Sequence, residues 1–176
     1  MSRVKIISTT IIILCFTQVM MAQSELIHQK INQDMYGNFS EAFATLDYDL
    51  FASIHSQEMI RVSGNGGEIK DWKTYLEGYK KRWSDPSQKS ALIDFRLLER
   101  ITSDSLVSDR GIYRVTYPNN SGKTKYSYGK FHVLLRLEDN YWKIIMDYDS
   151  DENKSIDKES FEIAFPLSEY KKYVKN

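Results

Sequence analysis

The chain has 176 residues, of which 41% are hydrophobic and 27% charged, and this composition is typical of one soluble globular domain. Its 24 basic residues balance its 24 acidic residues, so no surplus of charge favours nucleic acid or an anionic membrane surface as a partner. The only cysteine is Cys15, which excludes a disulfide framework and a thiolate metal site.

Residues 1–22 have the pattern of a cleaved secretory signal peptide. Arg3 and Lys5 give a positive start, an apolar stretch runs from residue 6 to residue 16, and Ala22 offers a small residue for cleavage. The apolar stretch is shorter than the roughly 20 residues that span a bilayer. We therefore expect a periplasmic or secreted bacterial protein with no membrane contact after cleavage; a retained N-terminal anchor is the alternative.

Three helices are expected in the first half of the chain. Apolar residues recur every four positions over 25–46, which indicates an amphipathic helix. Asp47 can cap a short second helix over 48–54. The third helix, over 70–83, carries a stripe of Trp and Tyr that predicts core packing, with ligand stacking as the alternative.

A short strand and a glycine-rich turn separate the second and third helices. Residues 57–62 form the strand, and the segment 63–67 most simply turns a hairpin. This segment is too short for a phosphate-binding loop and lacks the Lys-Ser/Thr that follows one.

Strands dominate the rest of the domain. Short polar turns join four long alternating segments, which predicts an antiparallel meander: 91–101, 106–117, 124–137 and 141–149. Helices followed by strands indicate an α+β fold, and we place this domain at 24–150. Residues 151–176 form a charged linker and a tail in which apolar residues return.

The register of the last hairpin decides where Asp147 and Asp149 point. Asp139-Asn140 suits a two-residue turn, because both residues tolerate positive φ. Counting from that turn by the two-residue period of a strand places an apolar set on one face: Phe131, Val133, Leu135, Leu137, Trp142, Ile144, Met146 and Tyr148. The two aspartates then lie on the outer face, opposite a histidine and a lysine. A one-residue bulge would reverse this prediction.

A second pair of carboxylates, Glu99 and Asp109, falls on the apolar side of two neighbouring strands. A five-residue loop between those strands would place Glu99 opposite Asp109. Two close carboxylates in an apolar cavity share a proton, and the pKa of one rises, which is one way to build an acid–base pair. The alternative is that both lie at the rim in water, or that Arg100 or Arg110 neutralises one of them.

The order helix–helix–strand–helix followed by four antiparallel strands resembles the nuclear transport factor 2-like superfamily, its SnoaL-like branch in particular. The last hairpin is similar to a subgroup motif, G-[RK]-[YF]-x-x-V-L-x-x-x-D-G-x-W-x-I-x-x-x-H-x-S, and matches it at Gly129, Lys130, Phe131, Leu135, Asp139, Trp142, Ile144 and Ser150. Tyr148 stands where the subgroup often has His. The resemblance covers residues 25–150.

The resemblance implies a cone, in which a strongly curved mixed or antiparallel sheet wraps around three N-terminal helices and encloses an apolar pocket. It also implies a homodimer. The superfamily includes ketosteroid isomerase-like, dehydratase-like and polyketide cyclase-like enzymes and many non-enzymatic binding proteins, so the fold does not assign a function. Tyr148 is a poor base near pH 7, so it does not replace an inherited histidine in acid–base chemistry.

We therefore interpret the chain as an exported protein that binds a small apolar or amphipathic molecule in the cone pocket without catalysis. The expected ligand-binding residues are Tyr79, Tyr113, Tyr148, Phe131, Met146 and Trp142. No cofactor is expected, and no metal site, because His28, His55 and His132 fall on different elements.

Two alternatives remain open. The first is an isomerase or cyclase in which Asp109 or Glu99 is the general base and Tyr113 or Tyr148 is the donor to a developing oxyanion. The second is a protein-interaction module whose apolar tail, Phe161–Tyr173, contacts a partner.

Overall fold

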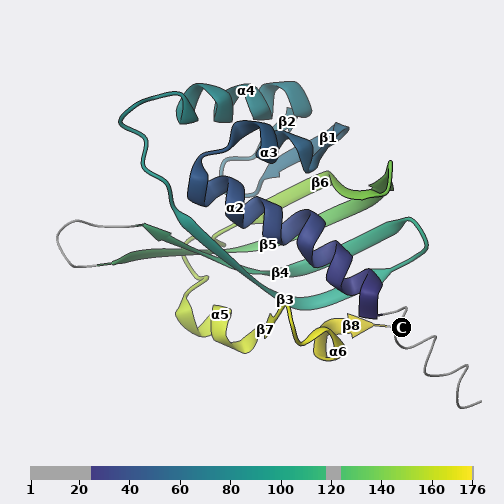
Figure 1. Ribbon diagram of the computed structural model, residues 1–176. Coiled ribbons are helices and arrows are strands. Elements are labelled where there is room, and N and C mark those ends of the chain that lie inside the picture. Colours follow the sequence, from purple (N-terminus) through teal and green to yellow (C-terminus); the bar gives the residue numbers. More distant parts are fainter. Residues whose placement is uncertain (1–24, 118–123, 176) are drawn as a thin grey trace, which may run out of the picture.

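The computed structural model describes residues 25–117 and 124–175 (Figure 1). The predicted signal peptide at 1–22 lies outside the described residues. Within the described ranges, no helix combines the length and the apolar character needed to cross a bilayer.

In the described residues, a curved, unclosed sheet of eight strands forms the body of the molecule. The strands are β1 (His55–Ser63), β2 (Glu68–Asp71), β3 (Leu92–Thr102), β4 (Leu106–Tyr117), β5 (Lys125–Glu138), β6 (Tyr141–Ser150), β7 (Phe165–Pro166) and β8 (Val174–Lys175). Their order is β2-β1-β6-β5-β4-β3-β7, and β8 also pairs with β3. The predicted antiparallel meander from β3 to β6 is confirmed, and β1 joins it as a parallel neighbour of β6.

A long N-terminal helix lies along the concave face of the sheet (Figure 1). Residues 25–31 are α-helical, η1 (Asn32–Gly37) is a π-helical segment, and α2 (Asn38–Thr45) completes the rod. Two shorter helices, α3 (Tyr48–Ser53) and α4 (Trp72–Trp83), follow it. Three N-terminal helices against a curved sheet confirm the predicted α+β cone.

The core fills the space between the N-terminal helix and the sheet. The four-residue apolar spacing of the helix predicts most of its buried face: Ile31, Met35 and Phe39 are buried, whereas Ile27 near the start of the helix is 45% exposed. Buried side chains on the inner sheet face meet them: Leu97, Val107, Phe131, Val133, Leu135 and Ile144. Asp47 caps α3 as predicted, and its side chain accepts a hydrogen bond from a backbone N–H at 2.9 Å.

The tail folds back onto its own domain. After α5 (Lys158–Ile163), β7 pairs antiparallel with β3; after α6 (Tyr170–Tyr173), β8 pairs parallel with it. Phe161 packs on the outer face of the sheet beside Ile112, and Tyr173 is completely buried in the main core. Two large apolar side chains of the tail, Phe161 and Tyr173, are thus buried against the domain of the same chain.

Candidate functional site

A bulge in β6 reverses the predicted orientation of Asp147 and Asp149. The predicted pairing holds from the turn as far as Leu135 and Ile144. The next residue of β5, Leu134, pairs with Met146, so Ile145 is an extra, unpaired residue in β6. Both aspartates therefore face the interior of the cone. The prediction that they point outward is wrong, and the bulge is the reason.

The same bulge removes two predicted ligand-binding residues from the cavity. Met146 and Tyr148 turn to the outer face, where Tyr148 contacts Gly64 so closely that a Cβ there would lie 2.5 Å from the phenol oxygen. Trp142 stays buried on the inner face, but it packs elsewhere and its backbone N–H donates to Asp34 at 3.0 Å. None of these three predicted residues lines the cavity described next.

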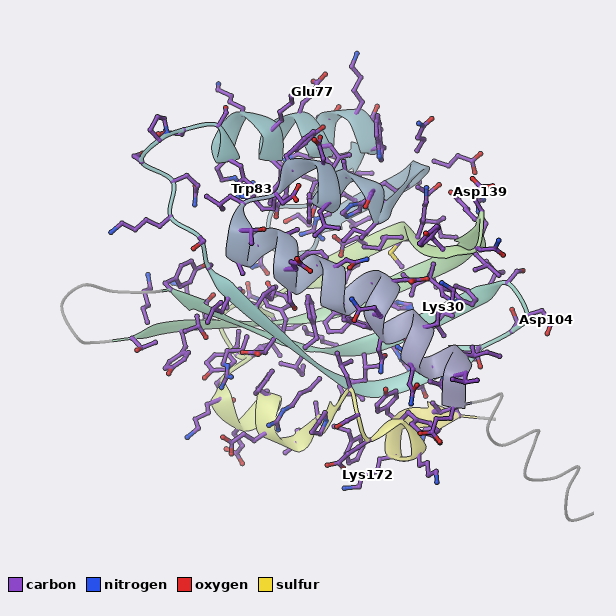
Figure 2. All side chains as sticks on the ribbon, viewed as in Figure 1. Lys30, Glu77, Trp83, Asp104, Asp139 and Lys172 are labelled. Atoms are coloured by element: carbon purple, nitrogen blue, oxygen red, sulfur yellow. The ribbon has the colours of Figure 1, made fainter. Side chains whose placement is uncertain are left out.

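A cavity of about 250 Å³ lies between α2, α4 and the concave face of the sheet. The predicted residues Tyr79, Tyr113 and Phe131 do line it. Aromatic side chains are the largest group in its lining. Trp83 lies between the ribbons of α4 and α2 (Figure 2), with its ring centroid 5.3 Å from that of Phe43.

The floor of the cavity is a charged cluster rather than an apolar surface. Arg61 donates to Asp149 at 2.5 Å and lies 3.5 Å from the nearer carboxylate oxygen of Asp147. Two tyrosines complete the cluster: the Tyr113 hydroxyl donates to Asp149 at 3.2 Å, and the Tyr75 hydroxyl donates to Asp147 at 3.4 Å. We call these five residues the floor cluster.

Strand pairing positions the floor cluster. Arg61 on β1 stands opposite Asp147 on the parallel strand β6, and its guanidinium also donates to the backbone carbonyls of Val62 and Asp147. Tyr113 on β4 faces Gly129 on β5, where a Cβ would lie 2.4 Å from the phenol oxygen. Only glycine leaves room for the ring to lie across β5 and reach the carboxylate on β6.

Burial gives Asp147 an unusual protonation equilibrium. Its pKa is raised from 3.8 to about 6, mainly because burial disfavours the carboxylate, with Arg61 opposing the shift and Asp149 adding to it. Burial likewise raises the pKa values of Tyr75 and Tyr113, so both phenols stay protonated near pH 7 and remain hydrogen-bond donors. Asp147 can therefore give or take a proton near neutral pH.

The carboxylates predicted to share a proton, Glu99 and Asp109, do not meet. β3 carries a bulge after Leu97, so Asp109 faces Arg100 and Glu99 faces Arg110. Arg100 donates two hydrogen bonds to Asp109, at 2.8 and 2.7 Å, in a fully buried pair, while Glu99 forms an ion pair with Arg110 on the outer face. Neither carboxylate lines the cavity. The acid–base pair is therefore not formed, and the alternative is confirmed, since an arginine pairs with each of the two carboxylates.

The three histidines lie on three different elements: the N-terminal helix, β1 and β5. His55 is buried with its Nδ1 2.7 Å from a backbone carbonyl oxygen, and burial lowers its pKa to about 4, so the ring is neutral near pH 7. His28 stacks on Tyr170, and His132 lies 2.9 Å from the hydroxyl of Ser108. In the portion of the chain that the structure covers, no three His, Cys, Asp or Glu side chains gather as a metal site.

No family model matches the sequence, and no curated protein matches it. Solved structures do match. A nuclear transport factor 2-like protein of unknown function from Shewanella oneidensis is 23% identical, with 70% of this chain and 98% of that chain covered and a TM-score of 0.57. A superfamily protein from Salmonella enterica is 12% identical, with 72% and 92% covered and a TM-score of 0.57.

The association domain of CaMKII from C. elegans is 11% identical, with 72% of this chain and 98% of that chain covered and a TM-score of 0.58. These likenesses show that the chain has the nuclear transport factor 2-like fold, as the order of its elements predicts. Export and a homodimer stay predictions.

Proposed function

We propose that this protein binds a small, flat, amphipathic molecule in the cavity between α4 and the concave face of the sheet. The observation that carries the proposal is the pairing of aromatic walls with a polar floor. Ligand sites usually combine mostly apolar walls with a few polar groups that fix orientation. At about 250 Å³ the cavity is smaller than the roughly 300–1,000 Å³ of drug-sized sites, which favours a compact ligand of no more than about three rings.

The floor cluster supplies hydrogen-bond acceptors to such a ligand. Each oxygen of Asp149 is already engaged, one by Arg61 and the other by Tyr113, but a carboxylate oxygen accepts more than one hydrogen bond. The side chain of Asp149 is 29% exposed and that of Asp147 is 12% exposed. A hydroxyl or amino group on the inner end of the ligand therefore finds its partner at Asp149 first.

Blocking the cavity tests the binding proposal. Val115 lines the cavity, and its neighbour Thr116 points to the opposite face of β4. We expect Val115→Trp to weaken binding of the neutral fluorophore N-phenyl-1-naphthylamine by at least about tenfold, because the indole would occupy the ligand volume. Thr116→Trp is the matched control and should bind the fluorophore as the wild type does.

Circular dichroism spectra establish that both tryptophan variants are folded. Equal affinities of wild type and Val115→Trp would show that the fluorophore binds outside the cavity. Failure of the wild type to bind the neutral fluorophore would contradict the proposal directly.

A second candidate function is proton transfer, as in an isomerase or cyclase, with Asp147 as the general base. The specific observation that favours it is a buried carboxylate with a pKa of about 6 beside a protonated phenol, Tyr75. In this role Asp147 removes a proton next to a ligand carbonyl, and a phenol donates to the oxyanion that develops.

Deuterium exchange tests this second candidate. We expect the wild type to speed exchange of the α-hydrogens of small aryl ketones, at a rate that rises with pH through about 6 as Asp147 becomes the active carboxylate. Asp147→Asn should lower the rate by about 100-fold or more, whereas Asp94→Asn on the outer face should leave it unchanged. Exchange by the wild type no faster than in buffer would leave binding as the only proposed function.

A further inference from the structure

The mouth of the cavity carries two cationic side chains. Arg82 stands in the last turn of α4, and Lys89 lies in the loop that leads to β3. Both line the cavity, and within the described ranges neither has a carboxylate oxygen within 4.0 Å. Many other cations of this chain do have such a partner. In the described residues, the two positive charges at the mouth are thus without a carboxylate partner.

The guanidinium of Arg82 lies over an aromatic ring at the mouth. The guanidinium carbon lies 4.3 Å from the ring centroid of Tyr79, which belongs to the cavity wall. A stacked guanidinium keeps its N–H groups free in its own plane, where they can donate two parallel hydrogen bonds to an acid group. Arg82 is therefore placed as a donor at the edge of the cavity.

The inner end of the cavity has the opposite character. The floor cluster contains one arginine and two aspartates, so its acidic groups outnumber its cation. Apolar walls between mouth and floor, among them Phe43 and Phe95, focus the field that runs from one end to the other. An acid group on a ligand is repelled from the floor and attracted to the mouth.

We infer that the ligand is an amphipathic organic acid that enters with its flat apolar body first. Its carboxylate or sulfonate lies at the mouth on Arg82 and Lys89, and a hydrogen-bond donor at its inner end reaches Asp149. This inference rests on the proposed binding function and narrows it to one chemical class and one orientation.

Two fluorophores with the same body test the inference. 8-Anilinonaphthalene-1-sulfonate and N-phenyl-1-naphthylamine share their ring system and differ in the sulfonate. We expect Arg82→Gln/Lys89→Gln to weaken binding of the sulfonate by roughly tenfold and to change binding of the neutral compound by less than about twofold. Raising the salt concentration should weaken binding of the sulfonate compound and leave binding of the neutral compound unchanged, because the charges at the mouth are exposed to solvent.

The control variant loses the same number of positive charges, both of them from α4. Lys80→Gln/Lys81→Gln also loses two positive charges, but neither residue lines the cavity, so both fluorophores should bind as they do to the wild type. Val115→Trp, which fills the cavity, should reduce binding of both compounds.

Each contrary outcome has a distinct meaning. If the neutral compound binds and Arg82→Gln/Lys89→Gln leaves the sulfonate affinity unchanged, or weakens both compounds equally, the inference is overturned and the proposed function stands. If the sulfonate still binds to Val115→Trp, it binds outside the cavity and the inference is overturned. If the wild type binds neither compound, the proposed function fails together with the inference.

Discussion

Replacing Asp109 with alanine is expected to lower the free energy of unfolding by about 3–5 kcal/mol, because it leaves the guanidinium of Arg100 buried without its counter-charge. Neither member of this pair is exposed at all, and Tyr36 also loses the acceptor that its hydroxyl reaches at 2.7 Å. Urea unfolding followed by circular dichroism measures the loss.

Two further variants show whether the loss of stability comes from the burial of the ion pair or from the loss of a charge as such. Asp94 pairs with Arg114 on the half-exposed outer face, so Asp94→Ala should cost less than about 1 kcal/mol. Arg100→Met combined with Asp109→Leu should recover most of the stability lost in Asp109→Ala, because apolar residues replace a buried ion pair at little cost. If Asp109→Ala costs no more than Asp94→Ala, the buried pair does not contribute as its geometry indicates.

Tyr173→Ala is expected to destabilise the fold by about 3–5 kcal/mol, although Tyr173 lies only three residues before the last residue of the sequence. Its ring is fully buried, its hydroxyl donates to the backbone carbonyl of Leu167 at 2.7 Å, and the guanidinium of Arg100 lies 5.4 Å from the ring centroid. Urea unfolding again gives the loss. Ile163→Ala is the control within the same tail: its side chain is 67% exposed, so the change should stay within about 0.5 kcal/mol.

Removing residues 158–176 extends the same test. β3 would lose its pairing with β7 and β8, and the Arg100–Asp109 pair would lose the tyrosine that covers it. We therefore expect the shortened chain to be unfolded or aggregated. A shortened chain as stable as the wild type would instead support a tail that is free to contact a partner protein.

Local sequence patterns predict the helices, strands and turns of this fold well, because each of these elements is determined by residues that are close in sequence. The Asp139-Asn140 turn has φ angles of 49° and 67°, as its side chains allow, and Asp47 caps the helix that follows it. The four-residue apolar spacing of the N-terminal helix likewise gives most of its buried face. These signals require no knowledge of distant parts of the chain.

The site is harder to predict because two bulges and one long-range pairing build it. Counting by twos along a strand fails after Leu97 and after Ile144, and the extra residues, Leu98 and Ile145, are as apolar as their neighbours. Nothing local in those segments identifies a bulge. The two wrong predictions follow from these bulges. Asp147 and Asp149 face inward although they were expected outside, and Glu99 and Asp109 are not opposite each other.

Arg61 is the residue of the candidate site that is hardest to predict from the sequence. It occupies a short strand beside a glycine turn, and its partner strand runs parallel to it, so no hairpin pattern joins the two. The aromatic residues Tyr79 and Tyr113 could be assigned to the cavity from their positions on a helix stripe and a strand face. The cation at the floor could not, because its role depends on which strand lies next to β1.

The parallel pairing of β1 with β6 also bears on the order in which this protein acquires its site. Arg61 and Asp147 are 86 residues apart in sequence, whereas the hairpins of the β3–β6 meander close locally. Contacts between distant segments carry the larger loop-closure cost and form late. A chain that has folded its meander but not yet docked β1 already has both aspartates on the inner face, without the arginine that balances them. The proposed site is therefore complete only once β1 has paired with β6, and it loses its cation when β1 separates from the sheet.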